Sequence, residues 1–386
     1  MPRPRIPRNA LVLAFVALLS GFGQDLITPI LPGFLVLIGV GHAGIGFIDG
    51  LLQGSTSVFR FVSGLLSDRF HNRKRFVFLG YAASSVARPL LAMTGSFGSV
   101  ALLRLLDGVG KGMKDAPRDA LVADSAQAGG RGRAFGFHRF VDTSGSVLGP
   151  LAAAGLLFWL VPSLTSYRLI FLTAALPGSI ALFLIWKCVR EPEAVRAKQT
   201  PIRGRLPVAF WLFTLASSVA MLTKMNDSLF LTRVHDIGIA QNEIPLVFAG
   251  FTFIYAVISY PIGILSDRFG RLPFLCAGWG MLGLVELGFA NTSSIGFALV
   301  LLGFYGVFFA LTEGSGRALI ADLVPAENRG TAYAIFYTAT GLAVIIGGFG
   351  LGRVWDNASF TSAFTVSAIG SLIGAALFLR MWMHEK

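Results

Sequence analysis

Charged residues are few in this sequence. Asp, Glu, Lys and Arg make up 13% of its 386 residues, hydrophobic residues make up 54%, and the mean hydropathy is +0.70. Typical soluble domains have about 25% charged residues. The composition therefore argues against a set of soluble domains and indicates that lipid surrounds most of the chain.

Groupings of residues that carry enzyme or metal chemistry are also missing. The sequence has no Ser-His-Asp set, no Gly-rich phosphate loop, and no Cys and His cluster with metal-ligand spacing. Its two cysteines, Cys188 and Cys276, fall at predicted cytoplasmic helix ends, so we expect no structural disulfide. The sequence predicts neither an enzyme nor a cofactor or resident metal.

Long apolar runs fill the chain instead. A run of roughly 20 apolar residues is long enough to cross a hydrocarbon core as a helix. The runs lack the two-residue alternation that marks the strands of a β-barrel, so helices are favoured. We predict an all-α membrane protein with twelve transmembrane helices, at residues 10–38, 43–66, 74–94, 98–119, 133–160, 166–188, 207–232, 244–266, 272–291, 294–322, 329–352 and 359–382.

Basic residues are concentrated in alternate loops. The chain has 32 Lys and Arg against 20 Asp and Glu, and the surplus follows the second, fourth and sixth predicted spans. By the positive-inside rule, these loops and both termini face the cytoplasm. The positive charge then suits anionic lipid headgroups, and we expect no nucleic-acid partner. The predicted location is a bacterial cytoplasmic (inner) membrane, with many passes through the bilayer.

Two sequence motifs occur twice. GLLSDRFHNRKR at Gly64–Arg75 is matched by GILSDRFGR at Gly263–Arg271, 199 residues later. ALVAD at Ala120–Asp124 is matched by ALIAD at Ala318–Asp322, 198 residues later. Two motif pairs at nearly one offset indicate an internal duplication. The predicted parts are an N-terminal six-helix bundle at 1–188, a cytoplasmic linker at 189–206 and a C-terminal six-helix bundle at 207–386.

The first of these motifs resembles the loop motif of the major facilitator superfamily. In that family its aspartate pairs with nearby helix ends and arginines and holds the cytoplasmic side closed, as a latch. The first copy has His71 where glycine is usual, and the second has Leu272 and Pro273 where basic residues are usual. A basic loop that only sets topology would not explain the repeated Gly and Asp spacing. The resemblance assigns to this cytoplasmic latch Gly64, Asp68, Arg69, Arg73, Gly263, Asp267, Arg268 and Arg271.

Two further motifs are similar to those of the same family. Arg104 and Asp107 match its fourth-helix motif, in which the arginine is tied to proton coupling, with Asp107 in place of the commoner glutamine. Gly145, Gly149 and Pro150 match part of the fifth-helix motif of exporters that exchange a proton for substrate. The same residues would also suit a kinked, closely packed helix, so a hinge or packing role is expected for them.

The fourth predicted span carries a stripe of charges. Arg104, Asp107, Lys111, Lys114 and Arg118 are spaced 3, 4, 3 and 4 residues apart, which places them on one helix face. A central charge that faces lipid costs about 2.5–3.5 kcal/mol even by low estimates. The deep part of the stripe must therefore face protein or a watery cavity. Lys114 and Arg118 could instead reach the cytoplasmic surface.

Most other spans contain one or two ionisable residues. His138 and Asp142 are four residues apart and share a helix face, either as a proton site or as a structural pair. Lys224 could neutralise Asp25 or Asp227 across the bundle. The predicted proton-coupling and substrate cavity consists of Asp25, Asp49, Arg104, Asp107, Lys111, Lys114, His138, Arg139, Asp142, Lys224, Asp227 and Glu313.

A proton switch can form where two effects oppose each other. A carboxyl group in a dry cavity holds its proton more tightly than in water, whereas a nearby arginine favours its release. Glu286 lies on the ninth span, which is peripheral in the family's fold, and it stays outside the predicted site. The candidate carriers are Asp25, Asp49, Asp107 and Asp142, with Arg104 as their partner.

We expect a proton-coupled antiporter that exports a small polar or amphiphilic solute by alternating access. Its partners would be a small-molecule substrate, protons and the bilayer, and we expect a monomer. A second hypothesis is uptake of an organic anion, a metal chelate or a metal ion, because the stripe is mainly positive. A lipid flippase or a sensor on the same scaffold is a third. Met221 and Met225 resemble the methionine pair of copper-importing members, although methionines at helical spacing are more often core residues.

The topology can be tested with reporter fusions. A reporter after Lys386 and a reporter within residues 187–205 should both be cytoplasmic, because basic residues hold those segments inside. A reporter in the uncharged loop at residues 95–98 is the control and should report the opposite side. If the first two reporters lie on opposite sides, the twelve-helix topology is wrong.

Overall fold

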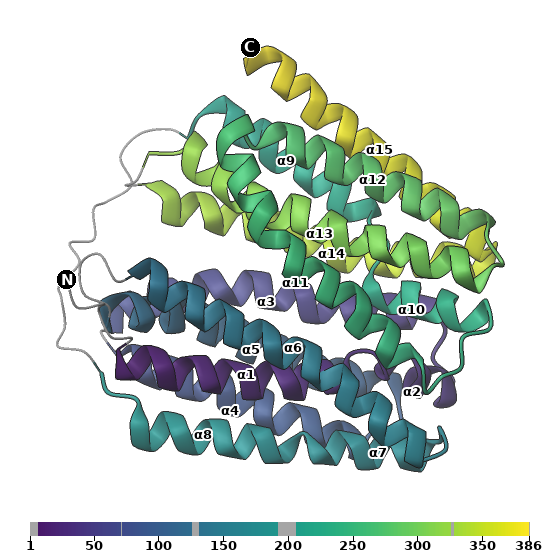
Figure 1. The fold of residues 1–386 in the computed structure, drawn as a ribbon, viewed down its shortest axis with the longest axis horizontal. Coiled ribbons are helices and arrows are strands. Elements are labelled where there is room, and N and C mark those ends of the chain that lie inside the picture. Colours follow the sequence, from purple (N-terminus) through teal and green to yellow (C-terminus); the bar gives the residue numbers. More distant parts are fainter. Residues whose placement is uncertain (1–6, 71, 126–130, 192–205, 326–327, 386) are drawn as a thin grey trace. The chain divides into compact units, whose positions relative to one another are not determined.

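The computed structural model describes residues 7–70, 72–125, 131–191, 206–325 and 328–385, without the side chains of residues 65, 68–70, 131–133 and 385. These parts of the chain contain helices and no β-strand (Figure 1). The helices are α1 (Arg8–Ile27), α2 (Leu31–Leu37), α3 (His42–Phe70), α4 (Arg73–Leu90), η1 (Leu91–Met93), α5 (Phe97–Ser125), α6 (Arg131–Trp159), α7 (Leu164–Thr173), α8 (Ala175–Cys188), α9 (Val208–Thr223), α10 (Asp227–Asp236), α11 (Ile244–Phe269), α12 (Leu272–Asn291), α13 (Ile295–Leu323), α14 (Arg329–Asn357) and α15 (Phe360–Glu385).

Ten helical segments of the described chain are long and apolar enough to cross a membrane. Four of them combine two consecutive helices each, namely α1 with α2, α4 with η1, α7 with α8, and α9 with α10. The chain is therefore a multi-pass helical membrane protein. The other two predicted spans, 43–66 and 98–119, coincide with α3 and α5, which are helices of 29 residues each. Both are richer in polar and charged residues, and their passage through the membrane stays a prediction.

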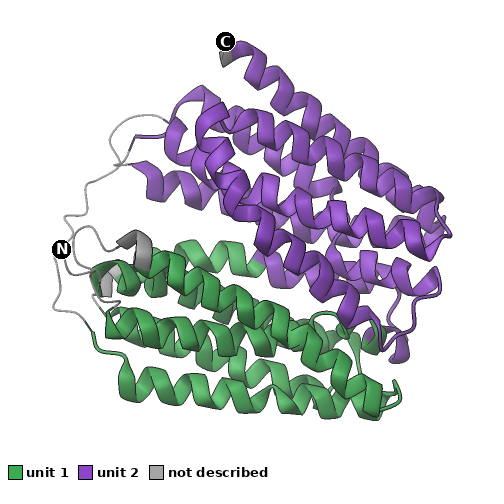
Figure 2. Ribbon diagram, in the orientation of Figure 1, with its two compact units in different colours: residues 1–34, 55–199 green, residues 35–54, 200–386 purple. Residues whose placement is uncertain are grey.

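The chain divides into two compact units (Figure 2). Unit 1 contains residues 1–34 and 55–199, and unit 2 contains residues 35–54 and 200–386. The division runs through α3, whose first residues belong to unit 2 and whose remaining residues belong to unit 1. The predicted bundles at 1–188 and 207–386 stay a prediction, because most of the predicted linker lies outside the described residues.

A break between α9 and α10 interrupts one span of unit 2. Lys224 is extended, with φ −67° and ψ 124°, and ends α9. Asn226 begins α10 as its N-cap, because its side-chain oxygen accepts a hydrogen bond from the backbone N–H of Leu229 at 3.1 Å. At the break, the backbone N–H of Met225 is satisfied by side chains of Glu286 and Ser367 instead of by a helical carbonyl group.

Glycines allow helices to touch within each unit. In unit 1, a Cβ on Gly145 of α6 would lie 2.9 Å from the carbonyl carbon of Leu18 in α1, and one on Gly149 would lie 2.8 Å from the backbone nitrogen of Leu26. In unit 2, a Cβ on Gly50 of α3 would lie 2.8 Å from the carbonyl oxygen of Val344 in α14. These distances are shorter than ordinary van der Waals contacts, so the backbones approach as closely as glycine allows.

Two glycines of α6 provide a matched test of this packing. Gly145→Ala should destabilise the purified protein by about 1–3 kcal/mol, because the new methyl group overpacks the contact with Leu18. Gly155→Ala is the control, since nothing lies within 4 Å of its Cβ position, and it should be neutral or stabilising by up to about 1 kcal/mol. Melting temperatures in detergent measure both. Equal effects of the two substitutions would rule out a close contact at Gly145.

Candidate transport and coupling site

Asp107 of α5 is the centre of a buried charge network in unit 1. Nε of Arg88 lies 3.2 and 3.3 Å from its two carboxylate oxygens, and Nη2 of Arg88 lies 3.1 Å from Oδ1. Nη1 of Arg104 lies 3.5 Å from Oδ2. Arg88 is 4% exposed, and Arg104 and Asp107 are each 1% exposed. Two guanidinium groups therefore face one carboxylate in the interior of the unit.

Arg88 also joins this network to α1. It lies near the C-terminal end of α4, and its Nη1 donates a 2.8 Å hydrogen bond to the carbonyl oxygen of Ser20. Its Nη2 lies 3.5 Å from Oε1 of Gln24. Sequence reasoning missed Arg88, which belongs to none of the motifs. The available signal was a charge deep inside the predicted span at 74–94, away from the basic residues at its start, since such a charge requires a partner.

Lys114 is a buried cation of the stripe on α5. Its Nζ donates to the Oγ of Ser20 at 2.6 Å and lies 4.1 Å from the ring centroid of Tyr81. Lys114 is 4% exposed, so its amine lies within unit 1 rather than at the surface. Among the described residues, its contacting partners are a hydroxyl group and an aromatic ring, which leave a positive charge uncompensated by any contacting carboxylate.

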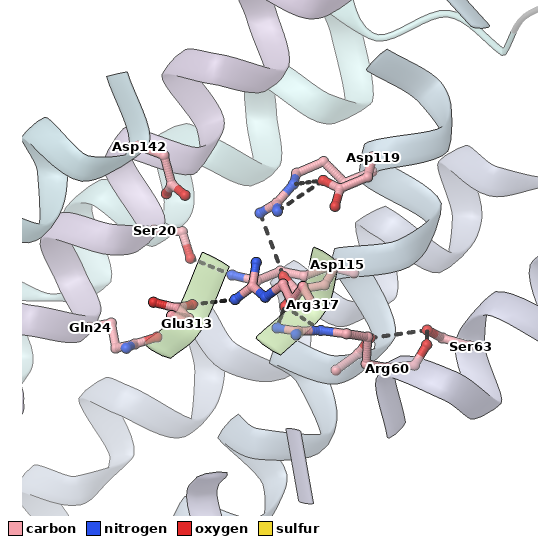
Figure 3. Close-up of polar contacts among 12 residues, drawn as sticks. Ser20, Gln24, Arg60, Ser63, Asp115, Asp119, Asp142, Glu313 and Arg317 are labelled. Atoms are coloured by element: carbon pink, nitrogen blue, oxygen red, sulfur yellow. Dashed lines mark hydrogen bonds and ion pairs between the residues drawn. The ribbon is translucent and has the colours of Figure 1, made fainter. Parts of the chain in front are cut away.

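A second chain of ion pairs extends from the end of the stripe. Asp115 lies between two arginines, with Nε of Arg60 at 3.1 Å and Nη1 of Arg118 at 3.5 Å (Figure 3). Arg118 also binds Asp119, through Nε and Nη2 at 3.1 Å each. The predicted site omitted Arg60, Asp115 and Asp119. The signal for the two aspartates was the alternation of charges in the run KDAPRD, which places opposite charges on adjacent turns of one helix.

Asp25 and Asp142 are the other predicted carboxylates of unit 1. Asp25 is 8% exposed and receives hydrogen bonds from Gln24, Thr28 and Ser146. Asp142 pairs with Arg139 at 3.9 Å. Lys111 interacts electrostatically with Asp25. Asp142 interacts electrostatically with His138.

His138 does not form the contact that its spacing from Asp142 suggested. His138 is buried, and its Nε2 has no hydrogen-bond partner in the described part of the chain. The i, i+4 spacing places both residues on one face of α6, but the carboxylate is directed to Arg139 instead.

In unit 2, three residues meet at the break between α9 and α10. Nζ of Lys224 lies 3.0 Å from the hydroxyl oxygen of Tyr305 and 3.7 Å from Oδ1 of Asp227. The Tyr305 hydroxyl donates to the same Asp227 oxygen. Lys224 therefore pairs with Asp227, one of the two partners that the sequence left open for it, and α13 supplies the tyrosine that joins them.

The other predicted residues of unit 2 lie on α3 and α13. Asp49 of α3 is buried and accepts a 3.4 Å hydrogen bond from Gln53. Glu313 of α13 pairs with Arg317 one turn away (Figure 3). It also accepts a hydrogen bond from the hydroxyl of Tyr255. Both carboxylates thus have polar partners within unit 2, and their part in transport stays a prediction.

The latch motif and the repeated ALVAD or ALIAD motif are joined by the same contact in each unit. Arg73 at the start of α4 pairs with Asp124 of α5. Arg271, just before α12, pairs with Asp322 of α13 at 3.4 Å. Both residues of the second pair follow those of the first by 198 residues. Sequence reasoning noted both motifs but did not assign Asp124 and Asp322 to the latch.

The other latch residues are described in part. Arg271 also pairs with Asp267, whereas the guanidinium of Arg268 lies 5.4 Å from the ring centroid of Phe269. Gly64 faces Ala116 of α5, with 3.5 Å between a Cβ at Gly64 and that of Ala116. The side chains of Asp68 and Arg69 lie outside the described residues. The role of Gly263 in the latch stays a prediction.

A multi-pass helical protein with such buried, paired charges has the character of a membrane transporter. The family model described as Major Facilitator Superfamily matches residues 13–234 and 212–386. The chain therefore belongs to the major facilitator superfamily, whose members are transporters and not enzymes.

Two relatives and one solved structure are similar to this chain over most of its length. An uncharacterised MFS-type transporter of Methanocaldococcus jannaschii is 31% identical over 382 residues, which cover 97% of this chain and 95% of the relative. A probable 4-methylmuconolactone transporter of Cupriavidus pinatubonensis is 26% identical over 344 residues, with coverage of 83% and 77%. The crystal structure of a mutant of the nucleoside transporter NupG has a TM-score of 0.82 at 15% identity, with coverage of 97% and 100%.

The network around Asp107 predicts a large effect of Arg88 on stability. Arg88→Ala removes the cation with the shorter contacts and leaves a buried carboxylate, which costs about 3–5 kcal/mol when a buried pair is broken. Arg88→Ala combined with Asp107→Ala should be less destabilising than Arg88→Ala alone. A double-mutant cycle on melting temperature measures the coupling. Additive effects of the two substitutions would contradict the pairing.

Proposed function

We propose that this protein is a proton-coupled antiporter that exports a small polar or amphiphilic solute by alternating access. The observation that carries the proposal is the buried set of Arg88, Arg104 and Asp107. A carboxylate that faces two arginines is held in its ionised form, and the loss of either arginine contact favours its protonation. Rearrangement of this set therefore couples the binding of a solute to the binding of a proton.

The proposed coupling follows from competition for Asp107. A solute that donates hydrogen bonds or positive charge to the carboxylate does so only while the proton is absent. A proton that binds to Asp107 weakens the attraction of that solute and frees the arginines. Solute and proton then occupy the site by turns, which is the requirement for exchange. The solute would release a proton when it binds, and an inward proton gradient would drive export.

The proposal includes the two-bundle organisation and the latch. Alternating access requires two bundles that rock about a central site. The pairs Arg73 with Asp124 and Arg271 with Asp322 lie next to the duplicated motif, and we assign them to the cytoplasmic latch. The protein would work as a monomer, with both termini in the cytoplasm.

A second candidate, uptake of an organic anion, is favoured by Lys114. The buried amine contacts a hydroxyl and an aromatic ring, and an anionic group could supply the missing negative charge. The lactone named for the Cupriavidus relative gives this candidate a comparable solute class. The two candidates differ in the direction of the proton gradient that drives flux into proteoliposomes.

The antiport proposal predicts the effect of Arg104→Ala. A solute is first found by a thermal-shift screen of the purified protein at two pH values, because binding raises stability. Without Arg104, Asp107 retains its proton more readily, so solute-induced proton release should fall at least several-fold and gradient-driven transport should be lost. Arg104→Lys keeps the charge without the planar fork and should recover only part of the release. A pH-indicator dye measures the release.

The matched control for this experiment is Arg353→Ala. Arg353 is an exposed arginine of α14, a helix long and apolar enough to cross a membrane, and it belongs to neither the predicted coupling site nor the predicted latch. It should bind the solute and release protons as the unmodified protein does. Normal proton release in Arg104→Ala would show that Arg104 is structural, and coupling would then be assigned to Asp25 or Asp142.

A further inference from the structure

Glu286 of α12 is a buried carboxyl group with unusual partners. It is 0% exposed, and it lies well inside a helix that is apolar enough to cross a membrane. Ser367 of α15 donates a 2.5 Å hydrogen bond to its Oε1, and Ser371 donates a 2.7 Å hydrogen bond to its Oε2. The sequence prediction left Glu286 outside the site because of its peripheral span. The partners of this carboxyl group place it next to the site instead.

The two serines can accommodate either protonation state of the carboxyl group. A hydroxyl group donates one hydrogen bond and accepts others, so it can turn from donor to acceptor when the carboxyl group gains a proton. Ser371 has Glu286 as its side-chain partner among the described residues, which leaves its hydroxyl free to turn. A fixed donor such as a backbone N–H group cannot turn in this way, whereas each oxygen of Glu286 has a serine hydroxyl group that can.

Glu286 is connected to the break between α9 and α10. The backbone N–H of Met225, left without a helical partner by the break, donates to Oε1 of Glu286 at 3.2 Å and to Oγ of Ser367 at 2.9 Å. The adjacent Lys224 donates to the carbonyl oxygen of the same Met225 at 3.3 Å and acts on Glu286 electrostatically. Lys224 therefore binds the backbone carbonyl group of Met225, and Glu286 binds its backbone N–H group.

The charges at the break do not balance when every group is ionised. Lys224 carries one positive charge, whereas Asp227 and Glu286 together carry two negative charges. An uncompensated carboxylate in a dry interior costs several kcal/mol, and the usual outcome is that the group binds a proton. One proton on either of the two carboxyl groups would balance the charges at the break.

The other ionisable groups near the break do not supply the missing positive charge. Tyr305 of α13 is neutral and donates to Asp227. Asp49 of α3 acts on Tyr305 and adds a further negative charge. The residues that α15 places on Glu286 are the two serines. In the described part of unit 2, Lys224 is therefore the cation shared by the two carboxyl groups.

We propose that Glu286 is a proton-carrying residue of unit 2 that shares one proton and the cation Lys224 with Asp227. While Glu286 holds the proton, Lys224 pairs with Asp227, as in this structure. When Asp227 is neutralised by a proton or by a solute, Glu286 gives up its proton and the lysine turns toward the new carboxylate. The role of this exchange in transport rests on the proposed function, and the proton site itself does not.

Infrared spectroscopy of the purified full-length protein tests the site without solute or gradient. A protonated carboxyl group in an apolar interior has a C=O absorption that a carboxylate lacks. Glu286→Gln should remove one such band from the spectrum at neutral pH. Glu243→Gln is the control, because Glu243 lies at the exposed N-terminal end of α11 in the same unit, and it should leave the band in place.

Asp227→Asn tests whether the proton is shared. This substitution removes the carboxylate that pairs with Lys224 and keeps Glu286. Glu286 should then ionise and pair with the lysine, so its band should disappear at neutral pH although Glu286 is present. A band that persists in Asp227→Asn would show a permanently protonated, structural acid and would overturn the proposal. A spectrum in which Glu286→Gln removes no band would overturn it as well.

Ser371→Ala keeps the test decisive if Glu286→Gln fails to fold. Removing the hydroxyl leaves one carboxyl oxygen without its hydrogen bond, so the band should shift to higher frequency. An unshifted band in Ser371→Ala would contradict the assignment to Glu286. If gradient-driven flux is absent from the unmodified protein but the band behaves as expected, the antiport proposal fails and the proton site stands.

Discussion

Every charge that this chain places among its membrane-spanning helices needs a partner from another helix or another turn. Arg88 and Asp107 illustrate the requirement, since α4 supplies the cation and α5 supplies the anion. A buried ion pair contributes little net stability, because desolvation offsets most of the attraction. Loss of one member is far more costly, because it leaves a charge that neither water nor lipid can solvate. Within each unit, the helices can therefore adopt only arrangements that bring these charged groups into contact.

Close contacts between helix backbones bring these charged side chains within reach of one another. In unit 1, a Cβ on Gly80 of α4 would lie 2.6 Å from the carbonyl oxygen of Gly110 in α5, and one on Gly112 would lie 2.6 Å from the carbonyl oxygen of Thr56 in α3. α5 thus touches helices on two sides through residues that alternate with its charged side chains. Small residues bring the axes together, and the long side chains of arginine and lysine then reach carboxylates on the neighbouring helices.

In unit 2, charged groups find their partners at a helix break. The break between α9 and α10 exposes backbone groups, and Glu286 and Ser367 satisfy the N–H of Met225. Lys224 stands at the break and pairs with Asp227 on the first turn of α10. Irregular backbone at membrane depth is tolerated only where other groups of the protein satisfy it. A helix break with a cation and two carboxyl groups around it is also a place where a small change in protonation rearranges several contacts at once.

The sequence by itself determined the all-α membrane class and the family, because apolar runs of sufficient length and local motifs need no tertiary contact to be recognised. It also placed Arg104, Asp107, Lys111 and Lys114 on one face of α5, since spacings of three and four residues define a helix face. Only the tertiary structure decided which cation meets which carboxylate. The contact of Arg88 with Asp107 could not be predicted because the two residues lie on different helices. The contacts of Glu286 could not be predicted either, because its donors come from Met225 and α15. Residues far apart in the chain become partners through helix packing, and periodicity within one helix carries no information about that.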